Sequence, residues 1–248
     1  MIKFFFKMKN SLKYTFLFLL LILMSCKEEV EKPKVIYENS TKQKEQPKTD
    51  TTQIKIADLP IQMQGTNYLL HPVADISVSG ANAKIKYDSS SSSTDLSLKI
   101  SNYSEYEITG YLQNLKFQEI GSDSIHSLTD KPILIQNVMY LKSVSDKAKQ
   151  QVLVYSLADL DTNKDGKLDE NDIKSLYISE ISGKRFTKVS VDFQELIDWN
   201  VIESRNRLYF RTIEDTNKNG QFDKNDVVHY HYLDLSNKDW KVFDYNPI

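Results

Sequence analysis

This 248-residue chain has few cysteines and glycines and no excess of positive charge. Cys26 is the only cysteine, and the sequence has no Cys–His pairing typical of a thiol enzyme. With seven glycines, it has neither a Gly-rich phosphate loop nor a nucleophile elbow. The formal net charge of −2 lacks the basic footprint of a nucleic-acid-binding protein. The apolar run from Tyr14 to Met24 is too short to cross a bilayer comfortably.

Two acidic twelve-residue stretches share one pattern. Residues 161–172 (loop 1) are DTNKDGKLDEND, and residues 215–226 (loop 2) are DTNKNGQFDKND. Each has oxygen-bearing side chains at positions 1, 3, 5, 9 and 12, a glycine at position 6 and a bulky apolar residue at position 8. Calcium takes six to eight oxygen ligands, and the glycine permits the sharp turn that gathers them. The pattern therefore predicts one calcium site in each loop.

The expected ligands are side-chain oxygens, except at position 7, where a backbone carbonyl serves. In loop 1 they are Asp161, Asn163, Asp165, the carbonyl of Lys167, Asp169 (directly or through water) and Asp172. In loop 2 they are Asp215, Asn217, Asn219, the carbonyl of Gln221, Asp223 and Asp226. Because Asn219 stands where loop 1 has Asp165, loop 2 carries one carboxylate fewer, and we expect it to be the weaker site.

A pair of Asx-rich turns is the alternative, since Asn, Asp and Gly are the residues that turns use. Two matches 54 residues apart, with the same five positions filled, favour calcium. Two carboxylates 4 Å apart repel by on the order of 4 kcal/mol at an effective dielectric of 20. We therefore expect the cation to be structural, holding together loops that would otherwise splay.

The pattern resembles the calcium loop of the EF-hand family, with two departures. Position 12 is Asp172 or Asp226, where that family usually has a bidentate Glu. The flanking stretches, such as QVLVYSLADL and VVHYHYLDL, are rich in β-branched and aromatic residues with a period near two, which predicts strands in place of helices. Calcium loops that join two strands occur in integrin-like propeller blades and in many bacterial surface proteins, and this chain resembles that usage.

Residues 1–25 are expected to be a targeting signal. Four lysines precede the apolar run, which ends in Leu23-Met24-Ser25-Cys26. This ending resembles the lipobox of bacterial lipoproteins, with Met24 a mild departure, and implies that Cys26 carries the lipid. A buried free cysteine is the alternative, and the neighbouring Lys27-Glu28-Glu29 disfavours it. Several acyl chains would then hold the mature protein on a membrane without a spanning helix.

The residues after Cys26 suggest a location and a linker. Lys27-Glu28-Glu29 resembles the export tag of lipoproteins that Bacteroidetes carry to the outer face of the outer membrane. A plain charged linker, with the protein on the periplasmic side, is the alternative. Residues 26–53 are polar and have almost no apolar periodicity, so we expect a disordered tether. Loss of residues 1–25 would move the formal charge to about −6, and two calcium ions would return it to about −2.

The remaining residues predict an all-β fold. In the N-terminal β region, residues 54–136, strands are expected at 67–70, 83–87, 96–101, 107–112 and 115–120, with a polar connector at 88–95, and a further strand at 133–141 crosses its end. A short helix is expected near residues 143–150. Residues 137–248 predict two four-stranded antiparallel meanders, each with a calcium loop in its central hairpin. Their strands are expected at 138–143, 152–158, 175–181 and 185–191, and at 199–204, 207–213, 227–235 and 240–245.

Repeats of this length suggest propeller blades. The phrase SLYISEISGKRFTKVS also resembles the blades of the propeller protein of the bacterial Tol system and related lipoproteins. At most about four blades fit into residues 54–248, fewer than most propellers need to close. An open stack of sheets, or a β-sandwich against the N-terminal strands, is therefore the alternative.

Other candidate sites are weaker. His229 and His231 alternate on one strand face, but a zinc site needs a further ligand, and His71 and His126 are far away in sequence. We expect the pair to be partly exposed strand residues. Glu195 and Asp198, just before Trp199, could form a glycosidase-like acid pair. A solvated turn preceding a core tryptophan is the simpler interpretation.

Three classes of function fit these features. The first is a calcium-stabilised, lipid-anchored binding module on the cell surface, with an outer-membrane protein or a glycan as its partner and exposed Tyr and Phe as contact residues. The second is a lipoprotein hydrolase acting on glycans or peptides. The third is a structural envelope protein. No catalytic pattern is evident, so we expect a binding module and not an enzyme.

Overall fold

The computed structural model describes residues 33–37, 53–77 and 100–248, all within the unit Pro33–Ile248. Several features expected from the sequence lie outside these residues: the signal segment 1–25, Cys26, the tag after it, the strand at 83–87, the connector at 88–95 and residues 96–99 of the strand at 96–101. Within the part of the chain that is described, no helix is long and apolar enough to cross a membrane.

Alternating side chains produce the strands, as the sequence predicts. In β13 (Arg207–Glu214), every second residue from Leu208 to Thr212 is buried and those between them are partly exposed. This is the pattern of a strand with one face against a core. The described strands pair antiparallel throughout, so the all-β, antiparallel prediction is confirmed.

The N-terminal sheet contains five strands. Its order is β1 (Gln53–Ala57), β3 (Tyr68–Ser77), β6 (Asn114–Glu119) and β7 (Ile125–Ser127), and β2 (Ile61–Gln62) also pairs with β3. The predictions at 67–70 and 115–120 correspond to β3 and β6. The sequence did not predict β1, β2 or β7.

The central sheet contains six strands. Its order is β11 (Thr187–Lys188), β10 (Lys174–Glu180), β9 (Val152–Ala158), β8 (Leu134–Tyr140), β5 (Glu107–Leu112) and β4 (Ser101–Tyr103). The first predicted meander is therefore present as β8 to β11, but β5 and β4 extend it. The expected boundary between residues 136 and 137 falls inside β8. The predicted strand at 185–191 pairs only over the two residues of β11.

The C-terminal sheet is the second meander, in the predicted order. Its strands are β12 (Gln194–Ile202), β13, β14 (Val227–Asp234) and β15 (Val242–Asp244). The strand β12 starts five residues before the predicted position and ends in a 3-10 turn, Glu203–Arg205. The predicted short helix is α2 (Lys142–Ala148), between β8 and β9.

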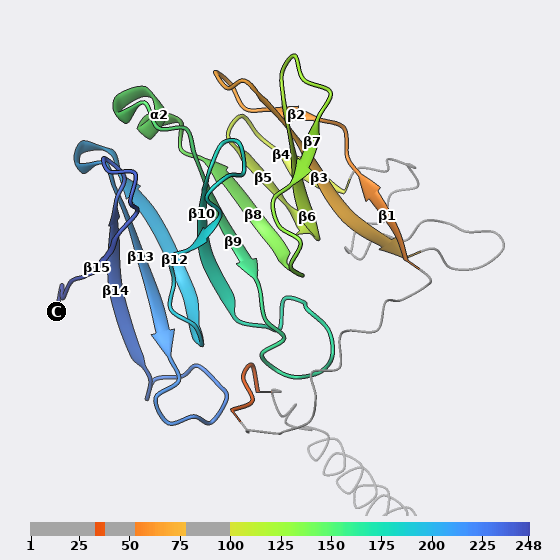
Figure 1. Ribbon diagram of the computed structural model, residues 1–248. Helices are drawn as coiled ribbons and strands as arrows, with labels where there is room; N and C mark the ends of the chain where they lie inside the picture. The colour runs from red at the N-terminus through yellow and green to blue at the C-terminus, as the bar shows by residue number, and fades with distance from the viewer. Residues whose placement is uncertain (1–32, 38–52, 78–99) are drawn as a thin grey trace, which may run out of the picture. The chain divides into compact units, whose positions relative to one another are not determined.

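The three sheets stack in layers, with the central sheet between the other two (Figure 1). The strand β9 explains this arrangement, because its side chains alternate between two apolar cores. Leu153, Tyr155 and Leu157 join the core shared with the N-terminal sheet, while Val152 and Val154 join the core shared with the C-terminal sheet. A strand buried on both faces is apolar almost throughout, as VLVYSLA is. The layered stack given as the alternative to a closed ring describes these sheets.

Candidate metal centre

Both acidic loops connect paired strands at the same end of their sheets. Loop 1 joins β9 to β10, and loop 2 joins β13 to β14. The two loops extend from the lower end of the sheets in Figure 1. The prediction that each loop closes the central hairpin of a meander is confirmed.

The first half of loop 1 is folded by its own acidic side chains. Asp161 accepts hydrogen bonds from the backbone N–H groups of Asp165 (3.2 Å) and Gly166 (2.9 Å). Asn163 Oδ1 accepts from Asp165 N at 2.9 Å, and Asp165 Oδ1 accepts from Lys167 N at 2.9 Å. Gly166 has a φ of +84°, a conformation that glycine adopts without the strain of a Cβ.

Loop 2 has the same network at the same positions. Asp215 accepts from Asn219 N (3.1 Å) and Gly220 N (2.7 Å). Asn217 Oδ1 accepts from Asn219 N at 2.9 Å, and Asn219 Oδ1 accepts from Gln221 N at 2.8 Å. Positions 4 and 6 also match, since Lys164 and Lys218 have φ near +57° and +56° and both glycines have +84°. The likeness of the two sequences therefore extends to their backbone conformations.

Position 12 ties the end of each loop to its beginning. Asp172 accepts from Thr162 N (2.7 Å), Asn163 N (3.4 Å) and Asp169 N (2.9 Å). Asp226 accepts from Thr216 N (3.1 Å) and Asp223 N (2.8 Å). In both loops, the short side chain of the Asp at position 12 thus binds the backbone of its own loop.

Burial differs between the two loops. Asp172 is 1% exposed, whereas its counterpart Asp226 is half-buried. Burial raises the pKa of the Asp172 carboxyl above its usual value, and the backbone N–H groups of Asp169, Thr162 and Asn163 oppose that rise. In loop 2 the buried acid is the one at position 1, Asp215, which is 3% exposed.

The donor set determines which ion each loop could hold. Every expected ligand is a carboxylate, amide or carbonyl oxygen, which suits a hard cation such as Ca²⁺ and lacks the sulfur and imidazole of transition-metal sites. In the described ranges, no three His, Cys, Asp or Glu side chains converge as a metal-binding group. The carboxylates at positions 1 and 12 instead bind backbone N–H groups of their own loops.

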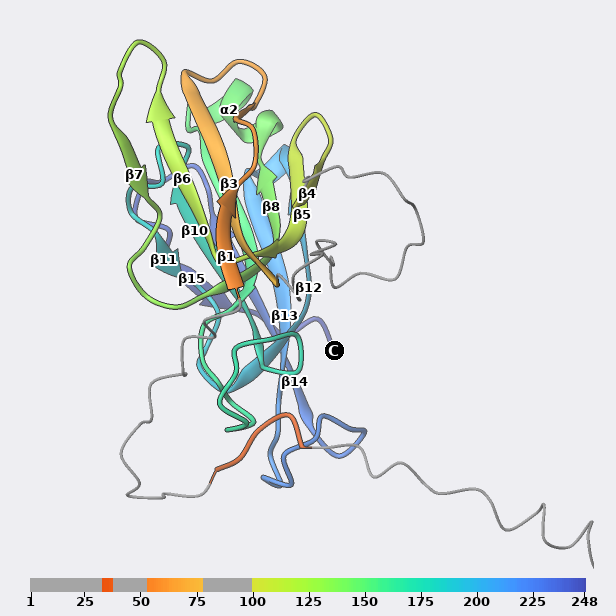
Figure 2. The ribbon, with the colours of Figure 1, turned by 90° about the vertical axis from the view of Figure 1, so that its right-hand side faces the viewer.

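Residues 33–37 lie between the two loops (Figures 1 and 2), where we expected a disordered tether. Lys34 N and Val35 N both donate to the carbonyl of Gly220, at 2.6 and 3.2 Å, and Ile36 N donates to the carbonyl of Thr162 at 2.9 Å. Val35 is 2% exposed. The disordered-tether prediction is therefore wrong for these five residues. The only sequence signal was the apolar run Val35-Ile36-Tyr37 in a polar linker.

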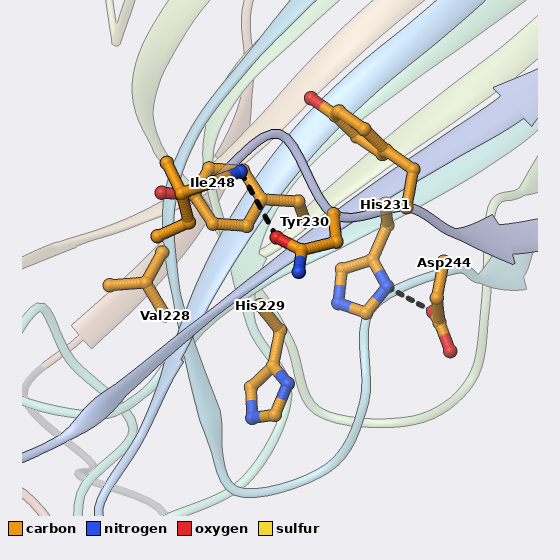
Figure 3. A pocket seen from close by; sticks show the side chains of 8 residues that line it. Val228, His229, Tyr230, His231, Asp244 and Ile248 are labelled. Carbon is orange, nitrogen blue, oxygen red and sulfur yellow. Dashed lines mark hydrogen bonds and ion pairs between the residues drawn. The ribbon is translucent and has the colours of Figure 1, made fainter.

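The histidine pair lines a cavity of about 370 Å³ at the edge of the C-terminal sheet (Figure 3). His229 Nε2 lies 2.7 Å from Glu214 Oε2. His231 is 5% exposed, so the expectation that both rings would be partly exposed is wrong for it. Both its ring nitrogens have protein partners, Asp244 Oδ1 at 2.7 Å and Thr212 Oγ1 at 3.2 Å. A zinc ion would have to displace these partners.

The expected acid pair is divided between two ion pairs. Glu195 binds Lys34 Nζ at 2.8 Å and Lys174 N at 2.8 Å. Asp198 pairs with Arg211, which donates from Nε at 2.8 Å. Both acids lie within β12 and not in a turn. Trp199 packs against the core between the central and C-terminal sheets. Each of the two acids is therefore paired with a different cation.

The outer face of the C-terminal sheet carries an aromatic cluster that sequence reasoning did not locate. Because Leu208 and Phe210 face the core, Tyr209 faces outward, as do its cross-strand neighbours. Tyr232 lies 5.7 Å from Tyr209 and 5.1 Å from Phe243 between ring centroids, and the Arg207 guanidinium lies 4.3 Å above the Tyr232 ring. We call this surface the Tyr–Arg face; it comprises Arg207, Tyr209, Tyr230, Tyr232, Phe243 and Tyr245.

No protein-family model matches the chain, and no curated protein sequence matches it either.

Proposed function

We propose that this chain is a calcium-binding, lipid-anchored envelope protein that serves as a binding module, in which calcium stabilises loops 1 and 2. The observation that carries the proposal is the repetition of one hydrogen-bond network, with matching φ angles, in two loops of matching sequence. Turn chemistry alone does not require the same oxygen at each of five positions in both hairpins.

In this proposal the oxygens assigned from the sequence hold the ion, six in each loop. Calcium would neutralise the four carboxylates of loop 1 and the three of loop 2, which otherwise repel one another. It would thereby fix the ends of the β9–β10 and β13–β14 hairpins. The chain's own residues supply the binding, and no chemical step is involved.

The calcium proposal is tested by melting the purified protein in calcium and in chelator. Calcium that binds only the folded state stabilises it by about 2.7 kcal/mol per site when the free calcium concentration is one hundred times the dissociation constant. We therefore expect chelator to lower the melting temperature, and magnesium to compensate poorly because it prefers a rigid octahedral site. Identical melting curves in calcium and chelator would contradict a structural role.

The Tyr–Arg face is the surface we propose for binding. Tyrosine rings and an arginine are the groups enriched where proteins contact partners, and tyrosine faces also stack on sugar rings. Tyr232→Ala should remove capture of the partner, an outer-membrane protein or a glycan, from detergent-solubilised envelopes, while a melting curve shows that the variant is still folded at the assay temperature. Leu59→Ala, at a residue 83% exposed in the connection between β1 and β2, is the control. A wild-type protein that comes back alone would favour a structural envelope protein.

Lipidation and location are tested separately. Cys26→Ser should abolish labelling by palmitate and release the protein from membranes. Protease added to intact cells should cut the wild-type protein if it faces outward, and an uncut protein would favour the periplasmic side.

The hydrolase alternative has one structural feature to examine. Thr212, His231 and Asp244 are hydrogen-bonded in the order of a nucleophile, a base and an acid. However, Thr212 is fully buried and its hydroxyl lies 2.6 Å from Gln194 Oε1, so a substrate has no route to it. A hydrolase screen on envelope glycans and peptides, with His231→Gln as the inactive control, would restore this alternative if activity appeared and depended on His231.

A further inference from the structure

Residues 33–37 make contacts with both loops at once. Gly220 of loop 2 accepts the N–H groups of Lys34 and Val35 through its carbonyl, and Thr162 of loop 1 accepts the N–H group of Ile36. The Thr162 hydroxyl also lies 2.9 Å from the carbonyl of Lys34. Figure 2 shows the segment between the loops from a second direction. One short segment thus connects two loops more than fifty residues apart in the chain.

The loop 1 contact depends on a candidate calcium ligand. Asp172 at position 12 accepts the Thr162 N–H, and its Oδ1 is also 3.2 Å from the Thr162 hydroxyl. The same hydroxyl meets the carbonyl of Lys34. A shift of the Asp172 carboxylate would therefore shift Thr162, the loop 1 residue that contacts residues 33–37.

The loop 2 contact depends on the glycine at position 6. A Cβ on Gly220 would lie 2.5 Å from the carbonyl oxygen of Val35 and 2.7 Å from Pro33 Cβ. At the equivalent Gly166 of loop 1, nothing lies within 4 Å of a Cβ. The segment therefore packs directly on the backbone at the sharp turn of loop 2.

Further contacts hold the segment in place. The Val35 side chain is buried, and Lys34 pairs with Glu195 at 2.8 Å, an acid that also binds the N–H of Lys174 just after loop 1. The Tyr37 ring lies 6.3 Å from the ring of Phe193 between centroids. The contacts thus extend from the loop backbones to the side chains of neighbouring residues.

We propose that residues 33–37 are a calcium-dependent latch, which docks when both loops are held in their metal-bound conformation and is released when the loops lose their ions. This inference rests on the proposed calcium sites and goes beyond them. Binding of calcium to the loops and docking of the segment favour the same loop conformation, so each strengthens the other by the same factor.

The latch would set how far the three sheets can move from the proposed lipidation site, Cys26. Pro33 stands seven positions after Cys26, a span of at most about 25 Å, whereas Gln53 of β1 stands 27 positions after it, at most about 95 Å. With the latch docked, only the seven residue steps from Cys26 to Pro33 separate the docked segment from the proposed lipidation site. With the latch released, the same sheets can reach several times further, so calcium concentration would control how far the Tyr–Arg face is presented.

The test is hydrogen exchange on the mature protein in detergent, read at the amides of Lys34, Val35 and Ile36. Removing calcium should accelerate their exchange by a factor of about 5 to 150, the usual range for coupled sites. Amides of β6, which pairs with β3 away from the loops, serve as the internal control. Calcium binding is measured on the same sample by calorimetry.

The outcomes separate the two proposals. If calcium binds and amides 34–36 exchange faster without it, the latch is supported. If calcium binds and the exchange rates of those amides are the same with and without it, the latch is overturned and the calcium proposal stands. If no calcium binds, both proposals are overturned.

Two glycine variants give a matched comparison at saturating calcium, with loading confirmed for each protein. Gly220→Ala and Gly166→Ala impose the same strain at φ +84°, but only the first places a methyl group against the segment. We expect fast exchange at 34–36 in Gly220→Ala and slow exchange in Gly166→Ala. Equal exchange in the two variants would overturn the latch.

The reciprocal effect gives a second measurement. Val35→Asn should undock the segment and weaken calcium binding by the same factor by which calcium slows exchange, with no change in charge. Leu59→Asn is the control, since that side chain is exposed and apolar. Unchanged calcium affinity in Val35→Asn would overturn the latch.

Discussion

Replacing Asp172 by alanine tests how far loop 1 is held by its last acid. The carboxylate accepts three backbone N–H groups, from Thr162, Asn163 and Asp169, and only the contact with Asn163 is long at 3.4 Å. Each buried donor left without a partner costs about 1–3 kcal/mol. The buried Thr162 N–H at about 1–3 kcal/mol and the half-buried Asp169 N–H at about 1 kcal/mol predict that Asp172→Ala lowers the free energy of unfolding by about 2–4 kcal/mol, even in chelator.

Loop 2 provides the matched control. Asp226 at the same position accepts two N–H groups, but it is half-buried and Thr216 is exposed, so water can replace it. Asp226→Ala should therefore cost about 1 kcal/mol or less in chelator, in line with a solvent-accessible hydrogen bond. The assay is urea denaturation of both variants and the wild type, followed by intrinsic fluorescence. Equal losses in the free energy of unfolding for the two variants would refute the claim that the buried Asp172 carboxylate stabilises loop 1 more than Asp226 stabilises loop 2.

Three further predictions concern the metal, the core and the surface. Asp161→Asn should weaken the tighter of two calcium-binding events in calorimetry and Asp215→Asn the weaker, because loop 1 carries more carboxylates; the reverse order would contradict this ranking. Leu153→Ala should cost about 2–5 kcal/mol in denaturation, since its side chain is fully buried, whereas Leu59→Ala should cost less than about 0.5 kcal/mol. The hydrogen bond from Arg211 lowers the pKa of Asp198 below 3.8, so this pair contributes stability above that pH and loses it as the pH falls through the lowered pKa. Arg211→Gln should raise the Asp198 pKa in an NMR titration, and an unchanged pKa would show that the ion pair is absent in solution.

Local sequence was sufficient to predict the hairpins but not the way in which the sheets stack. The strand β9 and the partners β13 and β14 were predicted within one residue at each end, because their apolar residues follow the strand period and a twelve-residue loop fixes the turn. The strands β2 and β7 have two and three residues and offer too short a pattern. Stacking depends on which apolar face meets which, and β9 is apolar on both faces, so its sequence does not choose between a ring and a layered stack.

In the candidate site too, the sequence predicted the local features and not the long-range contacts. The twelve proposed ligand positions come from spacing alone, since the pattern is local to each loop. The docking of residues 33–37 depends on contacts between residues as distant as Lys34 and Glu195, and the exposed Tyr–Arg face depends on the register of three strands, β13, β14 and β15. Neither of these long-range arrangements leaves a periodic signal in the sequence.

The most direct test of the account is the number of calcium ions that the purified mature protein binds, measured by equilibrium dialysis against millimolar calcium. We predict two ions per chain, with one lost in a variant carrying Asp161→Asn and Asp165→Asn and one lost in a variant carrying Asp215→Asn and Asp223→Asn. A wild-type protein that binds no calcium under these conditions, while remaining folded, would contradict the central claim.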